Sequence, residues 1–161
     1  AKLAEVEILA EMNDNFDILD VINNIVYVPG APAVAWTDGK GVFVSDGLFE
    51  WDVTAIYFVI NHEFDHIHFR HVERFHKSGL DHYVMNIAED LIINEMLVKD
   101  GLKKPNVGIF REDLEKEHGG KFLNHLLVGC FHRTNLNCLV NEFNPCKEYY
   151  DYFYSNHSFF Q

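Results

Sequence analysis

Two histidines and a glutamate stand in a pattern that could hold a metal ion and activate water. Residues 62–66 read His-Glu-Phe-Asp-His, an H-E-x-x-H pattern. On a helix, residues four apart lie on the same face, so His62 and His66 could bind one zinc ion together. Glu63, beside them, could accept a proton from a zinc-bound water. The pattern therefore predicts a hydrolytic zinc site.

The setting of this pattern favours a metal site over chance, although a chain with 10 histidines could carry such a pattern by accident. The preceding residues, Val53 to Ile60, are almost wholly apolar, and Asp52 is a suitable N-cap. No glycine or proline interrupts residues 53–75, so we expect one helix that begins in the core. A His-Glu pair on such a helix is costly unless something binds it.

A second apolar segment carries a polar stripe. From Asp81 to about Lys99 the residues are apolar nearly all round a helix, and Gly101 is placed to end it. Polar residues interrupt this helix at intervals of four: Asn86, Asp90 and Asn94, with Glu89 beside them. An unpaired buried polar group costs roughly 1–3 kcal/mol. The stripe should therefore face something polar, and a zinc ion on the preceding helix would serve.

Asp90 and Glu89 compete for the role of third zinc ligand. The residues one helical turn before and after Asp90 are polar, Asn86 and Asn94. The residues one turn before and after Glu89 are apolar, Met85 and Ile93. Hydrogen bonds usually orient metal ligands, so the neighbours favour Asp90, with the asparagines bonded to it or to the histidines. Glu89 would lie at the edge of the site or pair with a nearby Arg or His. Its longer reach keeps it as an alternative.

Taken together, these motifs resemble a family of predicted zincin-like metallopeptidases whose bacterial members usually carry a VWA-like domain behind the peptidase domain. The resemblance covers about residues 33–101 and rests on residues 37–39 (Thr-Asp-Gly), 42–44, 62–66, Arg70, His71, Arg74 and 86–94. It implies a zincin-like α+β fold, mostly helical, with a small N-terminal sheet beside the H-E-x-x-H helix. It also implies a Zn²⁺ cofactor, a peptide or protein substrate, and an aspartate ligand at Asp90. The chain would be a short, stand-alone version.

The metzincin extension of the motif is absent, because its glycine position is Phe69 and its third-histidine position is Val72. Without that glycine we expect the helix to run straight on. The third ligand should then come from the second helix, as in zincins with a carboxylate ligand. Zinc would activate a water, Glu63 would move its proton, and a second electrophile would stabilise the oxyanion. Candidates for this electrophile are Tyr83, His82, Arg70 and a C-terminal aromatic residue.

Two other functions remain open. The chain could be an inactive zincin fold used as a binding module, for instance an inhibitor of a host protein. It could also hold a structural zinc with a fourth protein ligand, His71 or His82. The presence of Glu63 favours an enzyme over the binding module, because an inactive fold has no need of a general base.

Composition limits the partners and the compartment. A net charge of −12 argues against binding nucleic acid through its phosphates, and no apolar run is long enough to span a membrane. The 161 residues, 48% of them hydrophobic, suit one domain over 1–161 with a packed core.

The three cysteines are Cys130, Cys138 and Cys146. Their number is odd and no signal peptide precedes them, so we expect reduced thiols in the cytoplasm. A second metal site with His125 or His132 is the less favoured alternative.

The remaining elements should form a scaffold around the two helices. We expect a helix over Lys2–Met12, whose apolar stripe continues to Ile22 past a break at residues 13–15. Strands are predicted at 25–28, 34–37 and 42–45, with a hairpin turn at 38–41. This hairpin could offer an edge strand to an extended peptide, or its edge could be covered.

In the C-terminal third of the chain, further helices are expected over 111–118, 122–131 and 145–154. The aromatic residues of the last could pack in the core or bind a protein partner.

Overall fold

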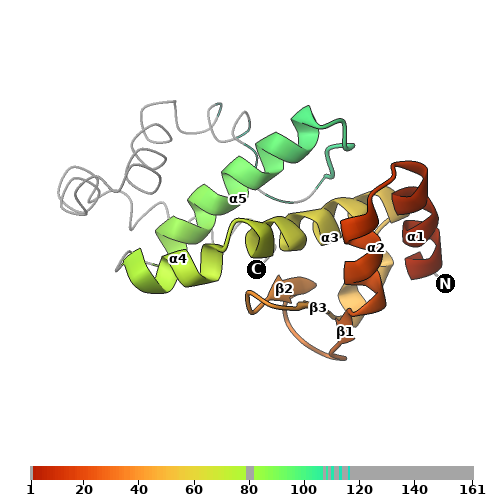
Figure 1. Cartoon of the computed structure of the whole chain (residues 1–161), viewed down its shortest axis with the longest axis horizontal. Helices are drawn as coiled ribbons and strands as arrows, with labels where there is room; N and C mark the ends of the chain where they lie inside the picture. The colour runs from red at the N-terminus through yellow and green to blue at the C-terminus, as the bar shows by residue number, and fades with distance from the viewer. Residues whose placement is uncertain are drawn as a thin grey trace.

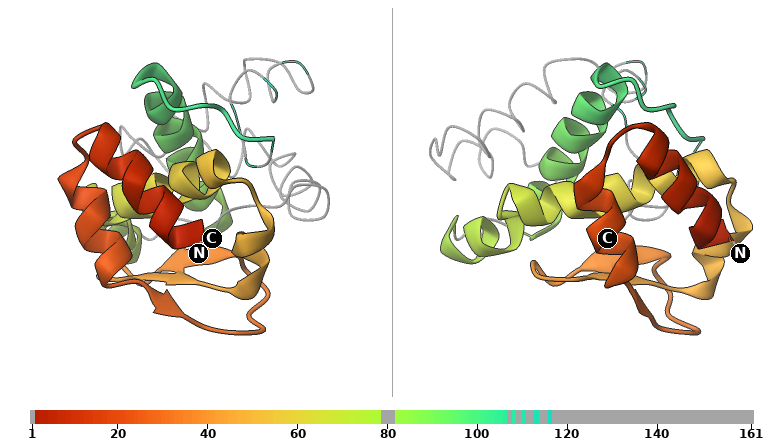
Figure 2. Two further views of the ribbon diagram at one scale, coloured as in Figure 1. Left: turned by 90° about the vertical axis from the view of Figure 1, so that its right-hand side faces the viewer. Right: turned by 45° about the vertical axis from the view of Figure 1, so that its right-hand side comes forward.

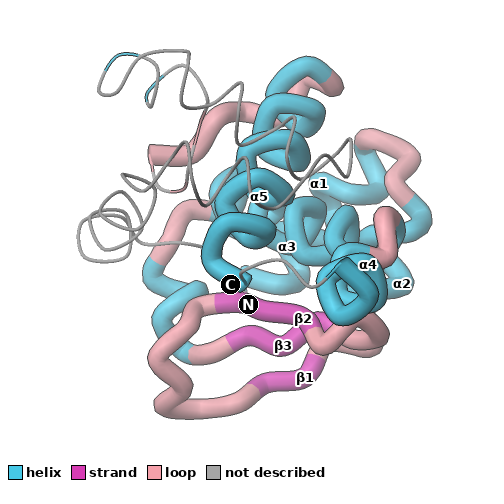
Figure 3. The backbone as a smooth tube through the Cα atoms, turned by 90° about the vertical axis from the view of Figure 1, so that its left-hand side faces the viewer, coloured by secondary structure: helices cyan, strands magenta, loops and turns pink. Residues whose placement is uncertain are grey.

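A computed structural model describes residues 2–78 and 82–106, together with 108, 110, 113 and 116. Helices dominate these residues, and a three-stranded sheet forms a small layer on one side of them (Figures 1 and 3). The predicted mixed α+β class is therefore confirmed, whereas its zincin-like character stays a prediction. Within the same residues, no helix combines the length and apolar character that a membrane crossing needs.

Two short helices open the chain, as predicted. Helix α1 (Lys2–Met12) and helix α2 (Phe16–Asn23) pack beside the central helix (Figure 2), burying Val6, Ala10, Ile18 and Ile22. The predicted break between them is present, but the two apolar residues that flank it do not join the buried stripe. Met12 is 76% exposed and Phe16 is 72% exposed. The reason is the intervening turn, in which Asp14 adopts a left-handed conformation (φ 52°) and carries both flanking side chains outward.

The sheet consists of β1 (Val26–Tyr27), β2 (Ala35–Thr37) and β3 (Val42–Val44), in the order β1-β3-β2. Strand β3 pairs in parallel with β1 and antiparallel with β2. The predicted hairpin turn is confirmed, because the Asp38 carboxylate accepts hydrogen bonds from the amides of Lys40 and Gly41, each at 2.9 Å. Since β3 lies in the middle, β2 is the strand of this hairpin that lies at an edge.

Helix α3 (Val53–His68) crosses above the sheet and forms the centre of the core. Its predicted N-cap is confirmed: an Asp52 side-chain oxygen accepts a hydrogen bond from the amide of Ala55 at 2.8 Å. All five residues from Ile56 to Ile60 are buried, and the core continues onto β2, β3 and the later helix over His82–Lys99. The apolar first turns thus fix the depth at which His62 and His66 lie.

The prediction of one straight helix over residues 53–75 is wrong. Helix α3 ends at His68, and a separate helix α4 (His71–Ser78) follows. Between them Arg70 adopts φ 56°, in the left-handed region that commonly ends helices and usually holds glycine. A non-glycine residue pays on the order of 1 kcal/mol for this conformation. The turn redirects the chain so that His71, only 3% exposed, packs into the protein.

Helix α5 (His82–Lys99) returns along α3 and packs against it (Figure 1). It buries Leu91, Ile93 and Leu97. Its predicted end is confirmed at Gly101, which has φ 96°. There the amide of Leu102 bonds to the carbonyl of Leu97 and that of Gly101 to Val98, which is the Schellman arrangement. Helices α3 and α5 are therefore neighbours, as the polar stripe of the second helix indicated.

Several predictions concern residues beyond this part of the chain. The helices expected at 122–131 and 145–154, most of the one at 111–118, the three cysteines and the aromatic C-terminal segment lie outside the described residues. These predictions stay untested.

The turn between β2 and β3 packs against the start of α4. Thr37 Oγ1 donates to the carbonyl of Gly41 at 2.6 Å and accepts from the amide of Gly39 at 3.1 Å. Gly39 has φ 95°, and a Cβ atom there would lie 3.2 Å from Cβ of Val72. The glycine therefore allows both the turn and the approach of α4.

We expect Gly39→Ala to lower the free energy of unfolding by roughly 1–3 kcal/mol, because it adds backbone strain and a contact with Val72. Chemical denaturation measures this change. Gly30→Ala is the matched control, since Gly30 also has a positive φ (75°) but a Cβ atom added there would meet no atom within 4 Å. Equal losses in the two variants would show that the approach of Val72 contributes nothing.

Candidate metal centre

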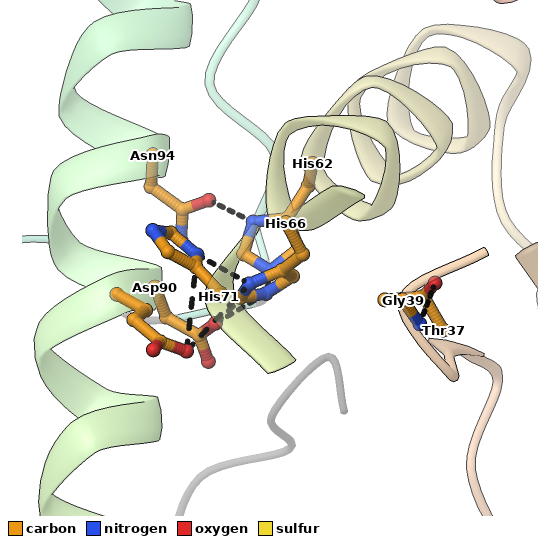
Figure 4. A network of polar contacts seen from close by, with 8 residues as sticks. Thr37, Gly39, His62, His66, His71, Asp90 and Asn94 are labelled. Atoms are coloured by element: carbon orange, nitrogen blue, oxygen red, sulfur yellow. Dashed lines mark hydrogen bonds and ion pairs between the residues drawn. The ribbon is translucent and has the colours of Figure 1, made fainter. Parts of the chain in front are cut away.

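Three donor atoms from two helices meet at one point in the interior. They are Nε2 of His62 and Nε2 of His66 on α3, and Oδ1 of Asp90 on α5 (Figure 4). The two nitrogens lie 3.1 Å apart, and Asp90 Oδ1 lies 3.1 Å from His62 and 3.0 Å from His66. The three residues are 0%, 4% and 1% exposed. The structure thus brings together the three residues that the sequence predicts as ligands.

Helical spacing on both sides of the contact produces this meeting. His62 and His66 share one face of α3, and Asp90 and Asn94 share one face of α5. Asn94 Oδ1 lies 2.6 Å from Nδ1 of His62, so the ring donates from Nδ1, and its Nε2 atom faces Nε2 of His66 and Oδ1 of Asp90. The expected bond between an asparagine of the stripe and a histidine is confirmed for Asn94. Asn86 is half-buried, one turn before Asp90.

The charges within this cluster are strongly coupled. Burial disfavours a proton on His62, but the Asp90 carboxylate outweighs that effect and raises the pKa of His62 to about 9. Burial lowers the pKa of His66. Burial would raise the pKa of Asp90, but the two histidines lower it below its ordinary value. Without a metal, a proton on His62 therefore balances the charge of Asp90, and a cation would take over that role.

Glu63 is the unsatisfied group of the cluster. Its side chain is fully buried, and neither carboxylate oxygen has a hydrogen-bond partner among the described residues. Burial raises its pKa to about 8, against the opposing effect of His62. A buried carboxyl group without partners is costly. Its orphaned oxygens therefore indicate a ligand, such as a water, that belongs to the complete site.

A second group of side chains lies on the other side of the His66 ring. His66 Nδ1 is 2.9 Å from Nδ1 of His71, and Glu89 Oε2 is 3.8 Å from both of these nitrogens. The expectation that Glu89 pairs with a nearby histidine is confirmed. His71 meets His66 at Nδ1, whereas the three-donor cluster uses Nε2. The sequence offered His71 as a fourth ligand of a structural zinc, but it did not reveal the turn at Arg70 that brings His71 to Nδ1 of His66.

A polar network behind the cluster was also missed from the sequence. The Asn15 amide nitrogen donates to Oη of Tyr57 at 3.1 Å and to Oδ1 of Asn61 at 3.0 Å, and the Asn61 amide donates to the Tyr57 carbonyl at 2.8 Å. Asn61 immediately precedes His62, so these bonds tie α2 to the helix that carries the histidines. The one available signal was the Asn-Asp-Asn run at the break between α1 and α2.

Among the candidates for stabilising the oxyanion, the structure describes the side chain of Arg70. The Arg70 side chain is 76% exposed and pairs with Glu73 at 3.6 Å. It is therefore not placed to stabilise an oxyanion there. The side chains of His82 and Tyr83 lie outside the described part of the chain, so their predicted roles stay untested.

The three-donor cluster fits a divalent metal ion better than a shared proton. Tetrahedral zinc with bonds of about 2.0–2.1 Å to nitrogen and oxygen places its ligand atoms roughly 3.3 Å apart. The three distances here are nearly equal, at 3.0–3.1 Å, as the separations between the ligand atoms of one ion are. A proton could satisfy only one pair. Within the described residues no further His, Cys, Asp or Glu joins this group.

The chain was compared with family models, with curated proteins and with solved structures. A family model described as "Putative metallopeptidase domain" matches residues 25–137, a stretch that includes both helices of the cluster. No curated protein and no solved structure matches the chain.

Proposed function

Since the chain belongs to the "putative metallopeptidase domain" family, we propose that it is a zinc-dependent peptidase with a zincin-like active site. His62, His66 and Asp90 would hold the zinc, and Glu63 would serve as general base. The observation that carries this proposal is the convergence of three buried donor atoms at 3.0–3.1 Å from one another. Two imidazoles and one carboxylate are a ligand set typical of catalytic zinc.

A zinc ion bound there would act as a Lewis acid and lower the pKa of a bound water towards ~7. By accepting from Nδ1 of His62, Asn94 would leave the Nε2 lone pair of that ring available to hold the ion. The Glu63 carboxylate takes a proton from the attacking water and returns it to the nitrogen of the leaving amine. A pKa of about 8 in the metal-free chain suits a group that both accepts and donates a proton near neutral pH.

We place the peptide substrate along β2. This strand lies at an edge of the sheet and packs next to α3. An extended peptide that paired with β2 would run beside the helix that carries His62 and His66. Backbone hydrogen bonds would then supply affinity with little dependence on the substrate's sequence, and neighbouring side chains would select among peptides.

Metal content and hydrolysis together test the proposal. We expect close to one zinc per chain by elemental analysis, and cleavage of a mixed peptide library followed by mass spectrometry. The double variant His62→Ala/His66→Ala should lose both properties. His68→Ala/His76→Ala is the matched control, because these two histidines of the same region are exposed.

The outcomes separate the rival functions. Unchanged zinc content in His62→Ala/His66→Ala would contradict the metal site itself. Zinc binding without cleavage of any peptide would favour a structural zinc or an inactive binding module.

A further inference from the structure

We propose that His71 is a positioning residue, which fixes the His66 ring in the tautomer that can bind the metal. Its Nδ1 atom accepts a hydrogen bond from the Nδ1–H group of His66, and this leaves the lone pair of His66 Nε2 facing His62 and Asp90. The inference rests on the proposed function, because it concerns a ligand of the proposed zinc.

The two nitrogens of a neutral imidazole ring play different parts. A neutral ring carries a proton on one nitrogen and a lone pair on the other, and the partner of one nitrogen decides which can bind a metal. Asn94 makes that choice for His62. For His66 the nearest partner of Nδ1 is Nδ1 of His71 at 2.9 Å, a hydrogen-bonding distance. Glu89 Oε2, at 3.8 Å from both nitrogens, is too far for a hydrogen bond.

This contact also defines the tautomer of His71. Once His66 Nε2 binds a metal, the proton of the ring sits on Nδ1, and Nδ1 of His71 must accept it. His71 then carries its own proton on Nε2. The nearby carboxylate of Glu89 favours a donor on His66 electrostatically, because it attracts the positive end of the N–H bond.

The distances favour this hydrogen bond over a second metal ion between His66, His71 and Glu89. In the first cluster the three separations are nearly equal, whereas here they are 2.9, 3.8 and 3.8 Å. Ligand atoms of one tetrahedral zinc are expected at equal separations of roughly 3.3 Å, and the range from 2.9 to 3.8 Å departs from that further than the first cluster does. A second ion would also require His66 to bind through both nitrogens and lose its last ring proton.

The fold has specific features that hold His71 in this place. The left-handed residue Arg70 turns the chain after α3, so that His71 points back towards α3 rather than continuing the helix. The following residue, Val72, packs against the turn at Gly39. His71 is 3% exposed, although it begins a surface helix. Its burial is therefore imposed by the turn and places one nitrogen against His66.

Two substitutions separate the acceptor from the ring. His71→Asn places an amide oxygen close to the position of Nδ1, whereas His71→Phe keeps the ring and removes the acceptor. We expect zinc to bind ~10–100-fold more weakly to His71→Phe and within a few-fold of wild type to His71→Asn. Competition with a chelator of known affinity measures this, and circular dichroism checks that both variants fold.

Nitrogen NMR of the zinc-loaded wild-type protein tests the same point without mutation. His66 should carry its proton on Nδ1 and His71 on Nε2. A proton on Nδ1 of His71 would overturn the inference, as would equal zinc affinity in folded His71→Phe and wild type. Two zinc ions per wild-type chain, falling to one in His71→Phe, would replace the hydrogen bond with a second metal site. Absence of zinc from the wild-type protein would instead refute the proposed function.

Discussion

Asp90→Ala is expected to weaken zinc binding by more than the ~10–100-fold that follows loss of an outer hydrogen-bond partner. Among the described residues, Asp90 supplies the carboxylate oxygen that lies within 3.1 Å of Nε2 of His62 and of Nε2 of His66. It is also the charge that the two histidines stabilise in the interior. Its removal would leave two neutral nitrogens, a poor site for a divalent cation.

Glu89→Ala is the matched control for this prediction, because Glu89 is the adjacent carboxylate on the same helix and is also buried. Its Oε2 atom lies 3.8 Å from His66, on the Nδ1 side of the ring. We expect a small loss of affinity in Glu89→Ala. Chelator competition on both variants decides the question, and a larger loss in Glu89→Ala would assign the ligand role to Glu89.

Glu63→Gln should lower the rate of peptide hydrolysis by roughly 10²–10⁴-fold, the usual effect of losing a general base. The amide keeps the shape of the side chain but cannot take up a proton at neutral pH. Zinc content should be unchanged, because Glu63 is not among the three converging donors. Elemental analysis and kcat on a cleaved peptide measure the two effects separately.

Asp65→Asn provides the control for Glu63→Gln. It removes another carboxylate within the same His-Glu-Phe-Asp-His segment, and Asp65 is half-buried. We expect kcat to stay within a few-fold of wild type in Asp65→Asn. If Glu63→Gln hydrolysed peptides at the wild-type rate, or if both variants lost activity equally, the role assigned to Glu63 would be wrong.

Local rules predicted most of the scaffold and the meeting of the two helices. The N-cap at Asp52, the hairpin turn at Asp38 and the helix end at Gly101 each depend on a side chain or glycine acting on its own neighbours. Helical periodicity then placed Asp90 and Asn94 on one face of α5. Helices α3 and α5 are both apolar apart from these polar faces. Burying the apolar residues of both helices therefore leaves few ways to pack them other than with the polar faces together.

Non-local packing decided what the sequence did not reveal. Arg70 has no intrinsic preference for a left-handed conformation, so the turn that buries His71 depends on contacts of α4 with distant residues such as Gly39. The parallel pairing of β1 with β3 likewise joins segments that local turn signals do not connect. Met12 and Phe16 have helical spacing but flank a turn, and spacing alone does not define which side faces the core.

The contact of Asp90 with both histidines joins positions that are 24 and 28 residues apart in the chain. A metal ion held between them would close this loop in the folded protein and would be released when the chain unfolds. By mass action such an ion adds ~2.7 kcal/mol to the free energy of unfolding when its free concentration is 100 times the dissociation constant. The lifetime of the folded protein in a cell would then depend on zinc supply, and zinc starvation would expose the chain to degradation as well as stop its hydrolysis.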